Sequence, residues 1–201
     1  MDSPTKSVIV FDFDGTLVDS NQAKYDAFFT VAEVEAIDAA IVTEVLSAHR
    51  EASRHEIVRL ILERANGAAP NELASRMAES YGELVLEVAK RCPEVPGAAR
   101  LLGNLGARYS LYLSSTTPEG PLRDIVAYRG WGRYFKGVFG YPRRKVDTLK
   151  EICLSEKIPA SSALVVGDGE SDRLAAEACG SGFFRIHPGR DFSELEALLA
   201  G

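Results

Sequence analysis

Residues 8–16 read Val-Ile-Val-Phe-Asp-Phe-Asp-Gly-Thr, an apolar run that ends in two acids and a turn. Because β-branched and aromatic residues favour extended structure, the run Val8–Phe11 predicts a buried strand. In an open α/β sheet, ligands bind at the carboxyl ends of the strands. Side chains two residues apart in a strand share a face, so we expect Asp12 and Asp14 to project together into such a crevice before the chain turns at Gly15.

Short apolar runs alternate with helix-length segments over the second half of the chain. The runs lie at Tyr109–Leu113, Gly137–Phe139, Ala163–Val166 and Phe183–Ile186, and the helical segments at Ala98–Leu105, Pro121–Tyr128, Val146–Lys157, Asp172–Cys179 and Ser193–Leu199. This alternation predicts an α/β fold with a Rossmann-like parallel sheet core and helices on both faces.

Residues 18–92 differ in character, since they contain no convincing strand. Apolar residues such as Ile57 and Ile61 recur there at helical spacing, which indicates about four helices. We therefore expect an all-helical cap inserted after the first strand. The expected domains are a discontinuous α/β core over residues 1–17 and 93–201 and a cap over residues 18–92.

Composition restricts the class of partner. The chain has 201 residues, 46% hydrophobic and 26% charged, with a formal charge of −6, so we expect a folded protein without affinity for nucleic acid or an anionic membrane. Three cysteines without metal-ligand spacing indicate neither a disulfide framework nor a zinc site. The run Val8–Phe11 is too short and too closely followed by acids for a signal peptide, so we expect a cytoplasmic protein. We expect it to be a monomer or a homodimer.

A second acidic cluster follows the apolar run Leu164–Val166, in the sequence Gly-Asp-Gly-Glu-Ser-Asp. If its strand neighbours the first, Asp168 reaches a metal beside Asp12, while Asp172 lies in the second coordination shell or at the positive end of a helix. Adjacent carboxylates repel unless a cation lies between them, so the clusters point to an acid/base pair or to Mg²⁺. The alternative is that both clusters are turns without chemistry.

The two clusters resemble motifs of the haloacid dehalogenase superfamily, in its phosphatase and phosphomutase branch with a helical cap, which includes phosphoglycolate phosphatase-like members. The first motif, D-x-D-G-T, is matched by Asp12–Thr16, and the fourth, G-D-x-x-x-D, by the residues from Gly167 to Asp172. The second motif is a Ser or Thr at a strand end, which Ser114 fits, although Ser115 and Thr116 are alternatives one and two residues later.

The third motif of the family is a lysine beyond the next strand, and Lys145 is our candidate. Many relatives have Pro after this lysine, whereas Val146 follows here, so Arg143 or Arg144 is an alternative. A cation is needed because a nucleophilic carboxylate, a metal-binding acid and a phosphoryl group carry more negative charge than one Mg²⁺ offsets.

The resemblance implies a Mg²⁺-dependent phosphomonoesterase that forms a phosphoaspartate. Asp12 would attack phosphorus, and Asp14 would be the acid and then the base, with its backbone carbonyl on the metal. The implied metal ligands are Asp12, Asp14 and Asp168, and the implied phosphoryl-binding groups are Ser114, Ser115 and Lys145. The family's dehalogenases lack the second acid of the first motif, so Asp14 argues against carbon–halogen chemistry.

The implied substrate is a small phosphorylated metabolite, either a sugar phosphate or a phospho-acid. A phosphomutase using the same site, and a catalytically silent relative that binds a partner, are the alternatives. Ser53 is a candidate helix N-cap, and the Ser53–Arg54 pair resembles the cap of sugar-phosphate mutases and phosphatases. Arg54 would then contact the substrate on cap closure; an exposed helical arginine without a role is the alternative.

Overall fold

The computed structural model describes residues 7–49, 52–187 and 189–200. The chain forms two compact units, one of residues Met1–Ser20 with Cys92–Gly201 and the other of residues Asn21–Arg91. The first unit is an α/β sheet unit and the second is all-helical in its described part. The predicted fold class, a parallel sheet core with an inserted helical segment, is confirmed.

A five-stranded parallel sheet in the order β3-β2-β1-β4-β5 forms the centre of the sheet unit. Its strands are β1 (Val8–Phe11), β2 (Ser110–Pro118), β3 (Gly137–Tyr141), β4 (Ala163–Gly167) and β5 (Gly182–Arg185). At the end of β1, Phe11 lies opposite Leu113 on one side and Val166 on the other. The residues that follow these three positions therefore meet at one edge of the sheet.

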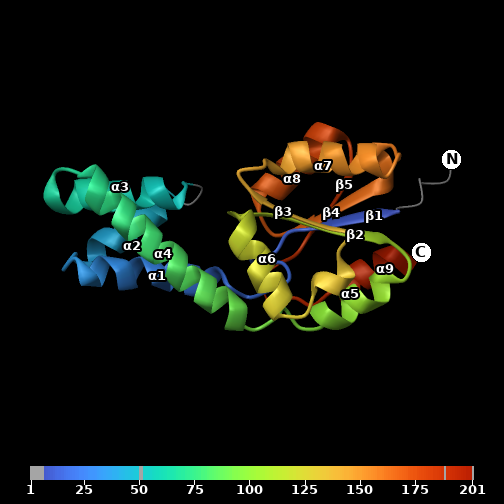
Figure 1. Ribbon diagram of the computed structural model, residues 1–201, viewed down its shortest axis with the longest axis horizontal. Helices are drawn as coiled ribbons and strands as arrows, with labels where there is room; N and C mark the ends of the chain where they lie inside the picture. The colour runs from blue at the N-terminus through green and yellow to red at the C-terminus, as the bar shows by residue number, and fades with distance from the viewer. Residues whose placement is uncertain (1–6, 50–51, 188, 201) are drawn as a thin grey trace. The chain divides into compact units, whose positions relative to one another are not determined.

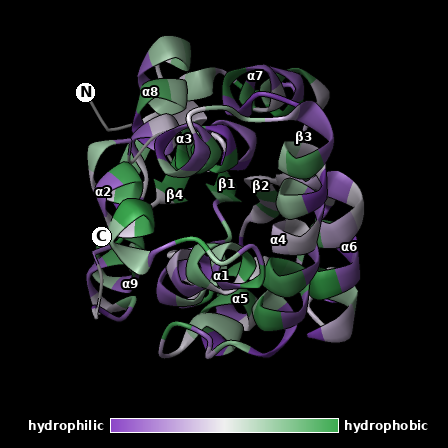
Figure 2. Ribbon diagram, turned by 90° about the vertical axis from the view of Figure 1, so that its left-hand side faces the viewer, coloured by the Kyte–Doolittle hydropathy of each residue, from purple (hydrophilic) through white to green (hydrophobic). Residues whose placement is uncertain are grey.

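Helices cover both faces of this sheet, with α7 and α8 on one face and α5, α6 and α9 on the other (Figure 1). They are α5 (Ala98–Gly106), α6 (Glu119–Tyr128), α7 (Lys145–Ser155), α8 (Glu170–Cys179) and α9 (Ser193–Ala200), with single 3₁₀ turns at Gly132–Tyr134 and Ala160–Ser162. Val8 and Val10 of β1 pack with Leu149 and Ile152 of α7. The apolar character of β1 is visible in Figure 2, and it explains why this central strand is buried on both faces.

The helical unit has a core of its own. Its helices are α1 (Asn21–Val34), α2 (Ala39–Ala48), α3 (Arg54–Asn66) and α4 (Asn71–Arg91). Phe28 of α1 stacks on Tyr81 of α4 with 4.1 Å between the ring centroids. The Ser53 side chain caps α3 by accepting a hydrogen bond from the Glu56 amide, as the sequence predicts. Within the described residues, no helix is long and apolar enough to cross a membrane.

The chain passes from the sheet unit into the helical unit after Ser20, which is later than the sequence suggests. Residues 18–20, which we expected in the cap, belong to the sheet unit. Val18 forms isolated bridges with Asp14 and Glu94, and the Asp19 amide donates to the Pro93 carbonyl at 2.9 Å. These main-chain contacts tie residues 18–20 to the sheet unit rather than to α1.

Strand β2 is also longer than predicted, so that Ser114 lies inside it and not after it. Ser114 pairs with Phe139 and Pro118 pairs with Tyr141, with a register shift between the two pairs. Gly140 allows this extension, because a Cβ atom there would lie 2.5 Å from the Thr117 carbonyl oxygen. The irregular end of β2 therefore passes against the backbone of β3 more closely than a side chain permits.

The end of β4 makes a similar close approach to α8. A Cβ atom at Gly167 would lie 2.4 Å from Cγ of Asp172 and 2.5 Å from its Oδ2. The Asp172 side chain is 2% exposed and is held by an ion pair with Lys145, so it has little freedom to move away. Glycine at position 167 is thus a requirement of packing.

We predict that Gly167→Ala lowers the free energy of unfolding by about 1–3 kcal/mol, the usual cost of overpacking a buried contact. Gly120→Ala is the matched control, because a Cβ atom at Gly120 would have no atom within 4 Å. Urea denaturation of both variants provides the measurement. A Gly167→Ala variant as stable as the parent chain would contradict the packing argument.

Candidate active site

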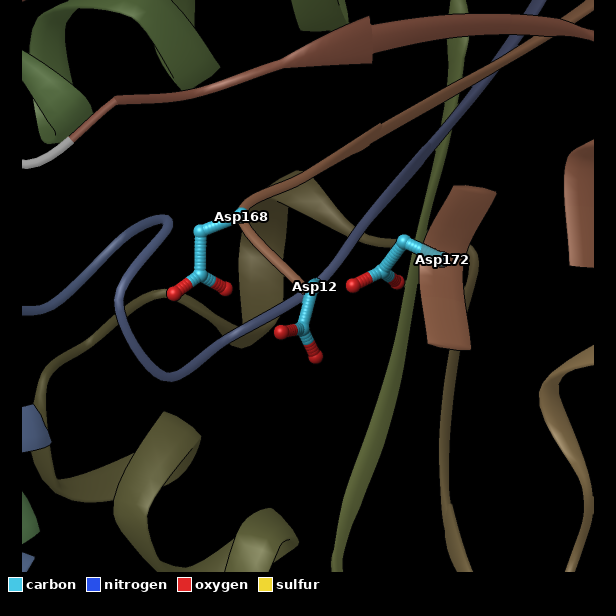
Figure 3. A group of neighbouring side chains, drawn as sticks. All are labelled: Asp12, Asp168 and Asp172. Atoms are coloured by element: carbon cyan, nitrogen blue, oxygen red, sulfur yellow. The ribbon is translucent and has the colours of Figure 1, made fainter. Parts of the chain in front are cut away.

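Three aspartates meet at the carboxyl edge of the sheet. Asp12 follows β1, Asp168 follows β4, and Asp172 lies in the first turn of α8. Each offers a carboxylate oxygen, and these oxygens all lie within 4.8 Å of one another (Figure 3). The two acidic clusters of the sequence therefore converge because β1 and β4 are neighbours in register.

Lys145 supplies a buried cation to this group. Its Nζ lies 2.9 Å from Oδ1 of Asp12 and 2.8 Å from Oδ1 of Asp172, and its side chain is 10% exposed. Lys145 is the first residue of α7, where the helix dipole disfavours a cation, so the carboxylates hold it there against that field. Arg143 pairs with Glu151 and Arg144 with Asp147, both at the surface, and Lys145 is therefore the inward-pointing basic residue of the three.

Burial and crowding shift the pKa values of Asp12, Asp172 and Lys145. Burial raises the pKa of the Asp12 carboxyl to about 7, with Lys145 opposing the shift and Asp172 and Asp14 adding to it. Burial likewise raises the pKa of Asp172, again against the effect of Lys145. Burial lowers the pKa of Lys145, but the two carboxylates outweigh it and raise that pKa overall. One ammonium is therefore shared between two acids.

Asp14 lies apart from the three-aspartate group. Its Oδ1 accepts a hydrogen bond from Ser20 at 2.6 Å and its Oδ2 accepts one from Thr117 at 2.8 Å. The expected sharing of a strand face with Asp12 is wrong, because β1 ends at Phe11 and both aspartates lie in the turn that follows. Asp14 is nevertheless close enough to raise the pKa of Asp12.

The serines at the carboxyl half of β2 differ in their partners. Ser115 accepts a hydrogen bond from the Thr117 amide at 3.1 Å, whereas the hydroxyl of Ser114 has no partner among the residues that the structure describes. Both serines are buried and Thr116 is exposed. Ser114 is thus the buried hydroxyl of β2 that makes no hydrogen bond to another described residue.

Arg54, the predicted substrate contact in the helical segment, lies in the other unit. It is the first residue of α3, and its guanidinium lies against Gly82 of α4, where a Cβ atom would be 3.1 Å from Nη1. Its Nε donates to Nε2 of His55 at 3.4 Å. It is half-buried within the helical unit.

Several polar contacts of the site were not predicted from the sequence. Ser20 and Thr117 hold Asp14, Thr16 donates to Oδ1 of Asp168 at 3.4 Å, and Arg185 donates to the Asp168 carbonyl at 2.9 Å. Thr16 belongs to the first motif, which was a usable signal. The contacts of Ser20, Thr117 and Arg185 arise at turns and strand ends, where the sequence has no periodic pattern that would predict them.

The donor set at this edge fits Mg²⁺. It consists of carboxylate oxygens, which hard divalent cations prefer, and the described residues bring no thiolate or imidazole into it. The lysine offsets only part of the negative charge of the aspartates, so a further cation is electrostatically favourable.

Comparison with known proteins gives matches over most of the chain. It is 30% identical over 193 residues to a phosphoglycolate phosphatase of Pseudomonas fluorescens (strain Pf0-1), a match that covers 86% of this chain and spans 66% of the relative's length. The fold resembles that of the HAD hydrolase YfnB from Bacillus subtilis bound to magnesium, at a TM-score of 0.72 and 20% identity, covering 98% of this chain and 100% of that chain.

The structure of a β-phosphoglucomutase from Clostridium difficile gives a TM-score of 0.70 at 17% identity, covering 96% of this chain and 88% of that one. The family model described as haloacid dehalogenase-like hydrolase matches residues 6–180. Because the match spans most of the sheet unit and the whole helical unit, the chain belongs to the haloacid dehalogenase-like hydrolase family.

Proposed function

We propose that the chain is a Mg²⁺-dependent phosphomonoesterase that acts on a small phosphorylated metabolite through a phosphoaspartate at Asp12. The observation that carries this proposal is the buried Lys145 ammonium shared by Asp12 and Asp172, beside the carboxylate of Asp168. A nucleophilic carboxylate, a fixed cation and oxygen donors for a metal are what transfer of a phosphoryl group requires.

In the proposed reaction an oxygen of the Asp12 carboxylate attacks phosphorus, and the bond between phosphorus and the leaving oxygen breaks. Asp14 gives that oxygen a proton. Asp14 then takes a proton from water, which attacks the phosphoaspartate, and the bond between phosphorus and Asp12 breaks to release phosphate. Ser114 and Lys145 bind the phosphoryl oxygens throughout.

Asp12, Asp168 and the backbone carbonyl of Asp14 would hold the metal, with Asp172 beside them as the partner that orients Lys145. Bound there, Mg²⁺ supplies charge neutralisation to the phosphoryl oxygens. Burial favours the neutral form of Asp12 and Lys145 opposes this effect, so a bound divalent cation would further favour the ionised, nucleophilic carboxylate. The magnesium in the similar Bacillus subtilis fold is consistent with this choice of ion.

The names of the relatives bear on the substrate. The matched Pseudomonas protein is a phosphoglycolate phosphatase, which supports a short phospho-acid as the substrate here, with a sugar phosphate as the other candidate class. A panel of such compounds, assayed for release of inorganic phosphate with Mg²⁺ and without any bisphosphate activator, tests the proposal. Interconversion of isomers without net phosphate release would favour the phosphomutase alternative.

We predict that Asp12→Asn reduces kcat by about three orders of magnitude or more, because an amide oxygen is a poor nucleophile and the phosphoaspartate cannot form. The substitution is nearly isosteric, so the fold is expected to survive. Asp124→Asn, at an exposed position of α6, is the control and should leave kcat unchanged. Substantial turnover by Asp12→Asn would rule out the covalent mechanism.

We predict that EDTA abolishes phosphate release and that Mg²⁺ restores it. Asp168→Ala should weaken Mg²⁺ binding by about tenfold or more, as expected when a charged ligand is removed. Titration calorimetry with Mg²⁺ measures this binding without any turnover, and Asp124→Asn should match the parent chain. Equal Mg²⁺ affinity in Asp168→Ala would remove this residue from the metal site.

The helical unit is proposed to act as a cap whose Arg54 contacts the substrate. In support, Arg54 is the first residue of α3, its side chain is half-buried, and no carboxylate among the described residues pairs with its guanidinium. A cation not neutralised by a neighbouring acid is free to bind the anionic group of a metabolite.

We predict that Arg54→Ala lowers kcat/KM for the best substrate of the panel by about ten- to hundredfold, the effect of losing one charge-assisted contact. Hydrolysis of p-nitrophenyl phosphate, which offers no second recognition group, should change much less. Arg59→Ala, an exposed residue of the same helix, is the control. If both substrates react at the parent rate, Arg54 is a surface charge.

A further inference from the structure

We propose that Thr117 is a positioning residue, which holds the carboxyl group of Asp14 for proton transfer to the leaving oxygen. This inference rests on the proposed function, in which Asp14 acts as acid and base. The sequence motifs assign no role to Thr117, which lies near the carboxyl end of β2 and three residues beyond Ser114.

The contact itself is direct and well placed. Oγ1 of Thr117 lies 2.8 Å from Oδ2 of Asp14, and Oγ of Ser20 lies 2.6 Å from Oδ1. Asp14 is 8% exposed, so these hydrogen bonds are largely shielded from water. With a hydroxyl on each oxygen, the plane of the Asp14 carboxyl group is held from both sides.

The backbone holds Thr117 in turn. Its amide donates to Oγ of Ser115 at 3.1 Å, and the register shift between Ser114 and Pro118 turns this part of β2 out of regular pairing. Gly140 then packs against the Thr117 carbonyl, where any side chain would clash. A β-branched side chain on a backbone held in this way has few rotamers, so the hydroxyl is directed at Asp14.

A hydroxyl suits a group that must gain and lose a proton. It donates to the carboxylate and can go on donating to the same oxygen pair after protonation, so the contact persists in both states and the acidic proton of Asp14 stays available to the leaving oxygen. Thr117 should therefore affect the rate most where a proton must reach the leaving oxygen. It should affect reactions with a weakly basic leaving group much less, because those need little protonation.

The test compares two substrates that differ in leaving group, phenyl phosphate and p-nitrophenyl phosphate. In Thr117→Val, kcat/KM for phenyl phosphate should fall about ten- to hundredfold, the range expected when general acid catalysis by Asp14 is partly lost. For p-nitrophenyl phosphate, kcat/KM should fall by no more than about threefold. Thr117→Ser keeps the hydroxyl and should stay within about threefold of the parent on both substrates. The ratio kcat/KM reports the step in which the leaving group departs.

Thr43→Val, the same substitution at an exposed position of α2, is the matched control and should change neither value. Equal losses on both substrates in Thr117→Val, or a Thr117→Ser variant as impaired as Thr117→Val, would overturn the proposal. Should Thr117→Val fail to fold, Thr117→Ala allows the same comparison with less steric demand. The parent chain and Asp12→Asn test the proposed function separately, so a failure of this inference leaves that result intact.

Discussion

The ion pair that Lys145 makes with both Asp12 and Asp172 is the interaction on which the rest of the site depends. It connects the end of β1 to the starts of α7 and α8, and it places a cation inside a cluster of acids. Burial disfavours the charged forms of Asp12, Asp172 and Lys145, as their pKa shifts show, so each of these three charges depends on the others. Gly167 belongs to the same arrangement, because any side chain there would push Asp172 out of place.

Much of the fold follows from local sequence. The five strands were predicted within a few residues because β-branched and aromatic runs alternate with helical segments. The convergence of the two acidic clusters was also predictable, since β1 and β4 pair in parallel and end together. Lys145 was preferred to Arg143 and Arg144 through the family resemblance alone, because the direction that the start of α7 gives each of these three adjacent basic residues cannot be read from the sequence.

The hydrogen-bond partners of Asp14 could not be predicted from the sequence, for a different reason. Its contacts come from Ser20, where the chain leaves the sheet unit, and from Thr117, in the irregular end of β2. Neither position belongs to a repeating pattern, and Thr117 depends in addition on the close backbone approach of Gly140. A predicted common strand face for Asp12 and Asp14 was wrong because the strand ends one residue before Asp12.

The central claim of the account is that Asp12 carries the phosphoryl group during turnover. The most direct measurement is rapid acid quenching of the enzyme during turnover of a phosphate-labelled substrate, followed by peptide mass spectrometry. The account predicts a phosphoryl group on the peptide that contains Asp12, sensitive to hydroxylamine and absent from Asp12→Asn. Steady turnover with no phosphoryl group on the protein, or with one on another residue, would contradict it.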